Sequence, residues 1–380
     1  MQTFAIRPFE APPGLPDLRA RLRAFLKAHM PDGPAERRAN CWAVPDAGFS
    51  RALGAAGYIG MIWPARYGGH ERHPLERYAV IEELLAAGAP VGMHWIADRQ
   101  SGAVLLRYGT EEQRQNFLPA MARGELYTCI GMSEPGAGSD LASVRTRGVR
   151  TDKGWRISGQ KVWTTNAHNA HLMLTLVRTG EGSERQEGLT QFLIDLKTPG
   201  VTVRPIVDLV GGHDFNEVFL DDVPVPDTMR VGPEGAGWKQ VTNELSLERS
   251  GPERYLSSFA LYLELIRRAG PNPEPATAAL IGRLTAEIWT LRNMSMSTAA
   301  KLAAGEDPAL EAAIVKDLGN SFEQELPHAV LAVADDVDLS EDTDFARILA
   351  LLLQVSPSFS LRGGTREILR GIIARGLGLR

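Results

Sequence analysis

Residues 155–167, WRISGQKVWTTNA, decide the fold class, because β-branched and aromatic residues crowd into a short run. Three runs of the same kind follow: HLMLTLVRT (171–179), LTQFLIDL (189–196) and VTVRPIVDL (201–209). Turn-forming residues such as Thr198, Pro199 and Gly200 separate these runs. Short strands at this spacing predict a small antiparallel barrel or sandwich. No segment between them fits the helical crossover that a parallel sheet needs.

Helical periodicity precedes this strand zone. One apolar face recurs through DLRARLRAFLKAHM (17–30) and consists of Leu18, Leu22, Phe25 and Leu26. A later helix is predicted to begin at Thr110, because Gln113 three residues on completes a capping box, and to be closed by Gly124.

Helical periodicity returns after Trp238. It is marked first by Leu280, Leu284, Ile288 and Leu291, and then by Ala312, Val315, Lys316 and Gly319. We therefore expect a multidomain α+β chain. An N-terminal helical domain should occupy residues 1–124, a central antiparallel β-barrel or sandwich domain 125–229, and a C-terminal helical bundle 230–380.

Composition narrows the class of function. The 380 residues are 44% hydrophobic and 23% charged, which is typical of a globular protein, and the net charge of −5 argues against a nucleic-acid partner. No apolar run reaches the roughly 20 residues of a membrane span, and the N-terminal residues lack a signal-peptide pattern. Two cysteines, Cys41 and Cys129, are too few for a disulfide framework or a cysteine metal cluster. We expect a protein of the reducing cytoplasm.

The loop GMSEPGAGSD (131–140) is the strongest functional signal. Its three glycines and one proline leave backbone N–H groups able to approach a ligand, and Ser133 and Ser139 add short hydroxyls. Such a loop suits hydrogen bonding to a polar ring edge or to phosphate oxygens. The plainer interpretation is a glycine-rich turn, but a ten-residue string is more specific than a lone glycine motif.

A second signal is GQKVWTTNAHNA (159–170), which places Trp163, Thr164 and Thr165 on a predicted strand. An indole can cover one face of a planar ring while a neighbouring hydroxyl bonds the ring edge. The alternative is a tryptophan of the β-domain core.

The third signal runs from residue 215 to 251. Alternation over Glu217–Leu220 predicts the end of a strand, Pro224 and Pro226 an extended crossing, and the turn to Gly237 the start of a helix. That helix carries Glu244 and Glu248, followed by Arg249.

The chain ends with SLRGGTREILRGIIARGLGLR (360–380), in which Gly363 and Gly364 precede Thr365. This pattern fits an ordinary helix start with Thr365 as the cap. It also fits a close approach of the backbone to a ligand.

Taken in this order, these segments resemble the acyl-CoA dehydrogenase family, as do GYIGMIWPARYGG (57–69), YGTEEQRQNFLPAMARGE (108–125) and GGTREILRGIIA (363–374). The resemblance covers nearly the whole chain. It implies an N-terminal helical domain, a central β domain and a C-terminal four-helix bundle. It also implies bound FAD, oxidation of an acyl-CoA thioester to the trans-2-enoyl form, and transfer of the electrons to an electron-transfer flavoprotein.

The resemblance also implies roles for particular residues. Those expected to line the flavin or the pantetheine of acyl-CoA are Met132, Ser133, Gly138 and Ser139. Those expected at the isoalloxazine are Trp163, Thr164 and Thr165. Thr365 and Glu367 match positions near the FAD, and Ser139 and Arg249 are expected on the substrate side.

The catalytic base is expected at Glu248. Many family members carry this carboxylate immediately before the Gly-Thr pair, where this chain has Gly363, which cannot take a proton. Others place it before an arginine on the first helix of the C-terminal domain, and LERSG points to Glu248 and Arg249. Glu244 is the alternative base, and an ordinary surface role is the alternative for Glu248.

Two family motifs for the FAD adenine half are absent. RRAGPNPEPATAAL (267–280) lacks an Arg-x-x-Phe-Gly string, and DDVDLSEDTDFARIL (335–349) replaces a Gly-Gly-x-Gly loop.

Three functions stay open: a dehydrogenase acting as a homodimer or homotetramer, a non-catalytic or half-site subunit of a heteromeric dehydrogenase, and an acyl-CoA oxidase. The acyl group cannot be predicted from these motifs.

Overall fold

The computed structural model describes residues 4–6, 8–180, 182 and 184–379, with the backbone alone for 244–248. The chain divides into two compact units. Unit 1 combines Met1–Trp42, Arg72–Pro90 and Ser246–Arg380, and unit 2 combines Ala43–Glu71 and Val91–Leu245.

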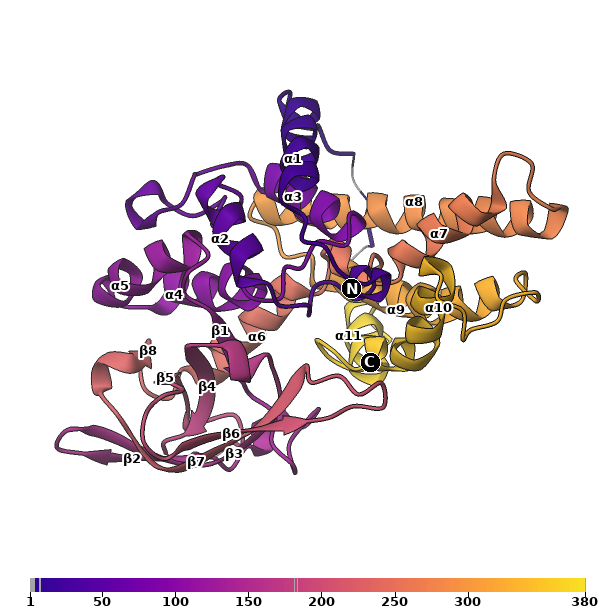
Figure 1. Ribbon diagram of the computed structural model, residues 1–380. Helices are drawn as coiled ribbons and strands as arrows, with labels where there is room; N and C mark the ends of the chain where they lie inside the picture. Colours follow the sequence, from indigo (N-terminus) through magenta and orange to yellow (C-terminus); the bar gives the residue numbers. More distant parts are fainter. Residues whose placement is uncertain (1–3, 7, 181, 183, 380) are drawn as a thin grey trace. The chain divides into compact units, whose positions relative to one another are not determined.

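Unit 2 is built on one eight-stranded sheet with the strand order β6-β7-β3-β2-β4-β5-β8, and β1 pairs with β4 (Figure 1). The strands are β1 (Thr128–Gly131), β2 (Arg147–Thr151), β3 (Gly154–Thr165), β4 (Leu172–Arg178), β5 (Leu189–Asp195), β6 (Val201–Ile206), β7 (Phe215–Val225) and β8 (Arg230–Val231). Pairing is antiparallel except for β1–β4 and a single β2–β4 pair. Within the residues described, no helical crossover joins consecutive strands, as the sequence predicted.

Strand β7 is longer than the sequence predicted. It passes Leu220 and continues through Pro224, which pairs with Arg156 of β3. On its other side β7 pairs with β6 only as far as Leu220. Pro224 therefore lies where β7 has one neighbour, a position at which a strand tolerates the missing N–H.

The main helices of unit 2 come before the sheet in the sequence. They are α2 (Ala47–Ala55), η3 (Ala97–Ser101), α4 (Gly102–Tyr108) and α5 (Glu111–Ala122). The capping box predicted at Thr110 is present, because Thr110 and Gln113 exchange hydrogen bonds between side chain and backbone. Gly124 follows the helix at φ +66°, as expected of a glycine beyond a helix end.

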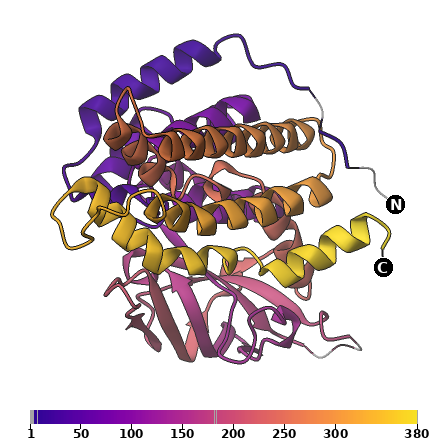
Figure 2. The same cartoon turned by 90° about the vertical axis from the view of Figure 1, so that its right-hand side faces the viewer.

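Unit 1 is helical. Its helices are α1 (Leu15–His29), α3 (Pro74–Ala86), α7 (Phe259–Ala269), α8 (Pro275–Ala303), α9 (Ala309–Leu331), α10 (Asp344–Val355) and α11 (Arg366–Gly376). Figure 2 shows α8 and α9 packed side by side. Most residues of the predicted apolar faces are buried, namely Leu18, Leu22 and Leu26 on α1 and Leu280, Leu284 and Leu291 on α8. Phe25 and Ile288, predicted on the same faces, are half-buried. Helix α6 (Gly237–Glu248) contains the boundary between the units.

Three further findings concern membrane spans, metal sites and cysteines. None of the helices described is long and apolar enough to cross a bilayer. Within the described residues, no group of His, Cys, Asp and Glu side chains could hold a metal ion. Cys41 and Cys129 are both free and buried.

His94 in unit 2 should make folding sensitive to acid. Its Nδ1 lies 2.8 Å from Ser50 Oγ, and burial, opposed by the charge of Asp98, lowers the pKa of His94 to about 4. Between pH 6.5 and 4 the unfolded chain therefore binds a proton that the native chain does not, and stability falls as the pH falls through this window. We expect this group to remove about 3 kcal/mol of unfolding free energy between pH 7 and pH 4.

Urea unfolding at several pH values measures this contribution. The His94→Gln variant should show a shallower loss of unfolding free energy below pH 6.5 than the wild type. His29→Gln, at an exposed position on α1, is the matched control and should keep the wild-type slope. Equal slopes for all three proteins would contradict the assignment to His94.

Candidate functional site

The predicted glycine-rich loop of unit 2 begins where β1 ends at Gly131. The carbonyl oxygen of Met132 accepts from Lys161 Nζ at 3.1 Å, and that of Ser133 accepts from Val162 N at 2.9 Å. Both carbonyls therefore face β3. In a trans peptide the N–H points opposite to the carbonyl, so the Ser133 N–H is directed away from Lys161. Within the described part of the chain, neither the Met132 nor the Ser133 N–H has an acceptor.

A buried ion pair holds this loop against β3. Lys161 is fully buried, and its Nζ lies 2.8 Å from Glu134 Oε1. The Glu134 carboxylate also accepts from Arg145 N at 2.6 Å and Thr146 N at 2.9 Å. Burial, opposed by Glu134, lowers the pKa of Lys161 to about 8. Burial favours the neutral acid of Glu134, but the Lys161 charge and hydrogen bonds outweigh it and lower that pKa.

Neither Lys161 nor Glu134 was predicted from sequence to have a role. The available signal was a single lysine in the middle of a strand, between Gln160 and Val162, where a cation needs a partner. Sequence alone did not identify that partner, because Glu134 lies 27 residues away along the chain.

Trp163 is not a core residue. It lies at φ +58°, within a register shift of β3 against β7 between Lys161 and Thr164. The indole is 58% exposed and meets the Phe215 ring edge to face at 6.0 Å. The alternative of a core tryptophan is therefore wrong. A non-glycine residue at positive φ carries backbone strain, which is frequent at ligand-binding positions.

The two threonines after Trp163 differ. Thr164 is fully buried, and its Oγ1 has no hydrogen-bond partner among the residues described. Its carbonyl accepts from Asn216 Nδ2 at 3.0 Å. Thr165 is half-buried and pairs with Phe215 at the end of β3.

Gly138 and Ser139 lie on the exposed part of the same loop, after a small turn in which Glu134 and Ala137 exchange backbone hydrogen bonds. No atom lies within 4 Å of the position that a Cβ on Gly138 would take. Packing within the described protein therefore does not require this glycine. The next residue, Asp140, pairs with Arg185 at 3.1 Å and anchors the far end of the loop.

In unit 1, Gly363 and Gly364 form a turn with φ of +66° and +101°. Thr365 occupies the N-cap position of α11 with extended backbone, but its side chain makes no capping hydrogen bond, in contrast to the prediction. The Thr365 hydroxyl is near enough to the Glu367 carboxylate to affect its pKa. The pKa of Glu367 is lowered by its own backbone N–H and then by this hydroxyl.

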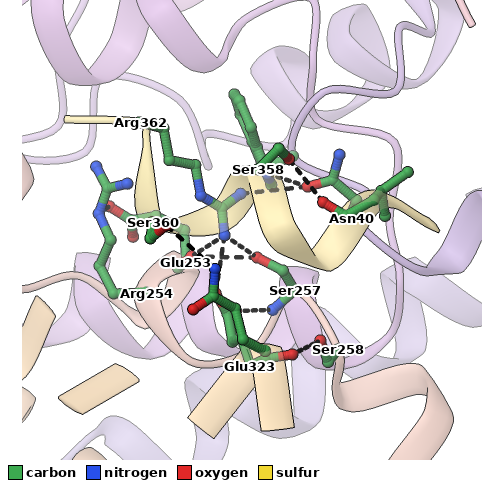
Figure 3. Close-up of polar contacts among 12 residues, drawn as sticks. Asn40, Glu253, Arg254, Ser257, Ser258, Glu323, Ser358, Ser360 and Arg362 are labelled. Carbon is green, nitrogen blue, oxygen red and sulfur yellow. Dashed lines mark hydrogen bonds and ion pairs between the residues drawn. The ribbon is translucent and has the colours of Figure 1, made fainter. Parts of the chain in front are cut away.

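Charged side chains form ion pairs next to this turn (Figure 3). Arg362 pairs with Glu323 at 2.9 Å and donates to Ser257 Oγ at 2.7 Å. Its guanidinium also lies over the Phe359 ring, 4.4 Å from the centroid. Glu323 is fully buried, and burial, opposed by the Arg362 charge, raises its pKa.

Gly363 has little room for a side chain. A Cβ there would lie 3.2 Å from Arg254 Nη2 and 3.3 Å from Lys316 Cε. Both residues are buried, so a carboxylate at this position would face two cations.

The predicted base Glu248 and its alternative Glu244 both lie on α6. Their positions four residues apart place them on one helical face. Their side chains lie outside the described residues. Arg249 follows directly, and its Nη2 lies 4.0 Å from the position that a Cβ on Gly364 would take. Unit 1 thus brings Arg249 beside the glycine turn.

Comparison with known proteins identifies the family. Residues 15–125 match the acyl-CoA dehydrogenase N-terminal domain, and residues 129–223 match the acyl-CoA dehydrogenase middle domain. The chain is 34% identical over 352 residues to acyl-CoA dehydrogenase IpdE1 of Mycolicibacterium smegmatis, a match that covers 87% of each protein. It is 35% identical over 342 residues to acyl-CoA dehydrogenase FadE34 of Mycobacterium tuberculosis, covering 88% of this chain and 46% of FadE34. The chain thus spans about half the length of FadE34.

Solved structures agree with these matches. The structure described as the Tcur3481-Tcur3483 steroid ACAD has a TM-score of 0.86 and 26% identity to this chain, and the match covers 98% of this chain and 99% of that one. The chain belongs to the acyl-CoA dehydrogenase family, whose members are flavin-dependent oxidoreductases. The resemblance drawn from sequence motifs and the expected fold class are confirmed.

Proposed function

We propose that the protein binds FAD and removes the α and β hydrogens of an acyl-CoA thioester to give the trans-2-enoyl-CoA. The observation that carries this proposal is the pinned loop of unit 2. Lys161 and Val162 hold the carbonyls of Met132 and Ser133, which leaves bare N–H groups beside a strand that presents Trp163. Donors of this kind suit the carbonyls and ring nitrogens of a flavin.

The residues present fit the ring half of FAD. Bare N–H groups at Met132 and Ser133 supply donors, and the exposed indole of Trp163 supplies an apolar face. In unit 2 we propose Thr164, Thr165, Gly138 and Ser139 as further flavin contacts. In unit 1 we propose Thr365 and Glu367 as residues that contact FAD. When bound, the flavin would supply the hydride-accepting chemistry. The protein would supply orientation.

Glu248 is the proposed base, with Glu244 as the alternative. A base for an α-proton must be a carboxylate whose pKa is raised towards neutral, which burial under an apolar acyl chain achieves. Position 363 cannot supply it, because glycine has no carboxyl group and the surrounding Arg254 and Lys316 would hold a carboxylate ionised. Arg249, beside the glycine turn, is proposed to contact the substrate.

Moving the carboxylate to position 363 should not restore activity. In a Glu248→Gln background, Gly363→Glu introduces a side chain at φ +66° against Arg254 and Lys316. We expect no recovery of acyl-CoA oxidation, because strain and two neighbouring cations oppose a basic carboxylate there. Gly363→Ala is the control that carries the strain without the charge. Recovered turnover in the double variant would contradict this view of position 363.

We propose that the acyl group is bulky and ring-containing, such as a steroid joined to CoA through its side chain. A fatty acyl chain is the alternative. The support is likeness to a structure described as a steroid ACAD. Incubation with steroid side-chain, long-chain and short-chain acyl-CoA thioesters, followed by mass spectrometry of the thioester, tests this. Loss of a hydrogen pair from a straight-chain thioester alone would overturn the ring-containing class.

A half-site role in a heteromeric dehydrogenase is the second candidate function. One reason is the likeness to the steroid ACAD structure, whose description names two proteins. The other is that the chain lacks both sequence motifs expected for the adenine half of FAD. The first candidate expects yellow protein when the chain is purified alone, as a homodimer or homotetramer. Colourless protein that gains FAD only with a partner chain would favour the half-site role.

We propose an electron-transfer flavoprotein as the electron acceptor, with oxygen as the oxidase alternative. Reduction of an added electron-transfer flavoprotein under argon supports the first. Hydrogen peroxide formed in step with enoyl-CoA supports the second.

We also propose that the chain consists of three domains, with boundaries at residues 124/125 and 229/230.

A further inference from the structure

Helix α9 packs along the C-terminal segment 357–366. Its side chains contact successive residues of 357–366: Gln324 Nε2 donates to Pro357 O, Glu323 pairs with Arg362, Lys316 donates to Gly364 O, and Asp317 and Ser321 bind Arg366. Figure 3 shows the Glu323–Arg362 part of this contact. Two residues in the middle of the segment, Gly363 and Gly364, have no side chain through which to be held.

Lys316 is the residue that holds the glycine pair. Its Nζ donates to the Gly364 carbonyl at 2.7 Å. Among the described residues, this is the only side-chain hydrogen bond to either glycine. Lys316 is fully buried, a costly position for an ammonium group. Glycines adopt many backbone conformations, so an external donor at this carbonyl removes freedom that the turn would otherwise have.

The hydrogen bond from Lys316 determines the orientation of the Gly364–Thr365 peptide. The Gly364–Thr365 peptide is trans, and its carbonyl is held by α9, so the Thr365 N–H points away from α9. Thr365 N has no acceptor in the residues described. It lies at the start of α11, where unbonded N–H groups attract hydrogen-bond acceptors.

We propose that Lys316 is a positioning residue, which fixes the orientation of the Gly364–Thr365 peptide and so presents the Thr365 N–H to the cofactor or substrate. This inference rests on the proposed function for the identity of the ligand. The orientation of the peptide itself does not depend on that function.

Lys316→Met removes the donor and keeps the side chain's length. In the cofactor-free protein we expect amide exchange in the peptide containing Gly363–Thr365 to become about tenfold faster. In the loaded protein we expect the FAD dissociation constant to rise about tenfold, because one ligand donor is no longer held in place. Lys316→Gln keeps a shorter, uncharged donor and should recover part of both effects.

The matched control is Lys301→Met. Lys301 is also buried on a long helix of unit 1 and pairs with Glu311, away from the glycine turn. It should lower the melting temperature without changing exchange at Gly363–Thr365 or FAD affinity. Equal exchange at the turn in Lys316→Met and Lys301→Met would overturn the proposal.

A protein that binds no FAD would remove the proposed function and leave the exchange measurement intact. If Lys316→Met fails to fold, Lys316→Gln carries the test. Its amide exchange at Gly363–Thr365 and its FAD dissociation constant should then lie between those of the wild type and those of Lys316→Ala, which has no donor and should show both effects in full. Unchanged exchange in Lys316→Ala would overturn the proposal.

Discussion

The Glu248→Gln variant should remain yellow and lose flavin reduction by acyl-CoA. Glutamine has the shape of glutamate and no basicity, so the α-proton stays on the substrate while cofactor binding persists. We expect the rate of flavin reduction to fall roughly 10²–10⁴-fold, the usual contribution of a positioned general base. Anaerobic stopped-flow absorbance of the bound flavin measures it.

The control for this experiment is Glu244→Gln, one helical turn earlier on α6. This variant should reduce its flavin at a rate close to that of the wild type. Retained activity in Glu248→Gln together with lost activity in Glu244→Gln would move the base to Glu244. Retained activity in both would remove α6 as its source.

Lys161→Met should cost unit 2 about 3–5 kcal/mol of unfolding free energy, because it leaves the Glu134 carboxylate buried without its ammonium partner. The same change removes the donor to Met132 O. The Ser133 N–H is then no longer held in one direction, so we expect weaker FAD retention as well. Urea unfolding and flavin release on dilution measure the two effects.

The matched control is Lys153→Met, an exposed lysine in the turn before β3. It should unfold as the wild type does. The Glu134→Gln, Lys161→Met double variant should be less destabilised than the sum of the single changes, because the pair is lost together. Lys161→Met with the stability of Lys153→Met would refute the ion pair's role.

Local rules predicted much of the fold. The Thr110 capping box and the apolar faces of α1 and α8 depend on residues within a few turns of each other. The capping box was found, and the leucines of both faces are buried. Strand β7 was underestimated, because the tolerance of Pro224 depends on where β6 stops pairing, a fact of sheet topology.

Local sequence rules predicted only part of the functional site. The glycine-rich loop and Trp163 were found as motifs, but the exposure of Trp163 follows from a bulge between β3 and β7. Lys161–Glu134 and Arg362–Glu323 join residues far apart in sequence, so spacing could not pair them. Lys316 was predicted only as part of a helical pattern, and the structure shows that it donates to the Gly364 carbonyl.

Anaerobic titration of the purified protein with acyl-CoA thioesters, followed by flavin absorbance, tests the proposed dehydrogenation most directly. We expect a yellow protein whose absorbance is bleached by at least one thioester, with the enoyl-CoA as product. A flavin that no thioester bleaches, with intact protein, would contradict the proposed function.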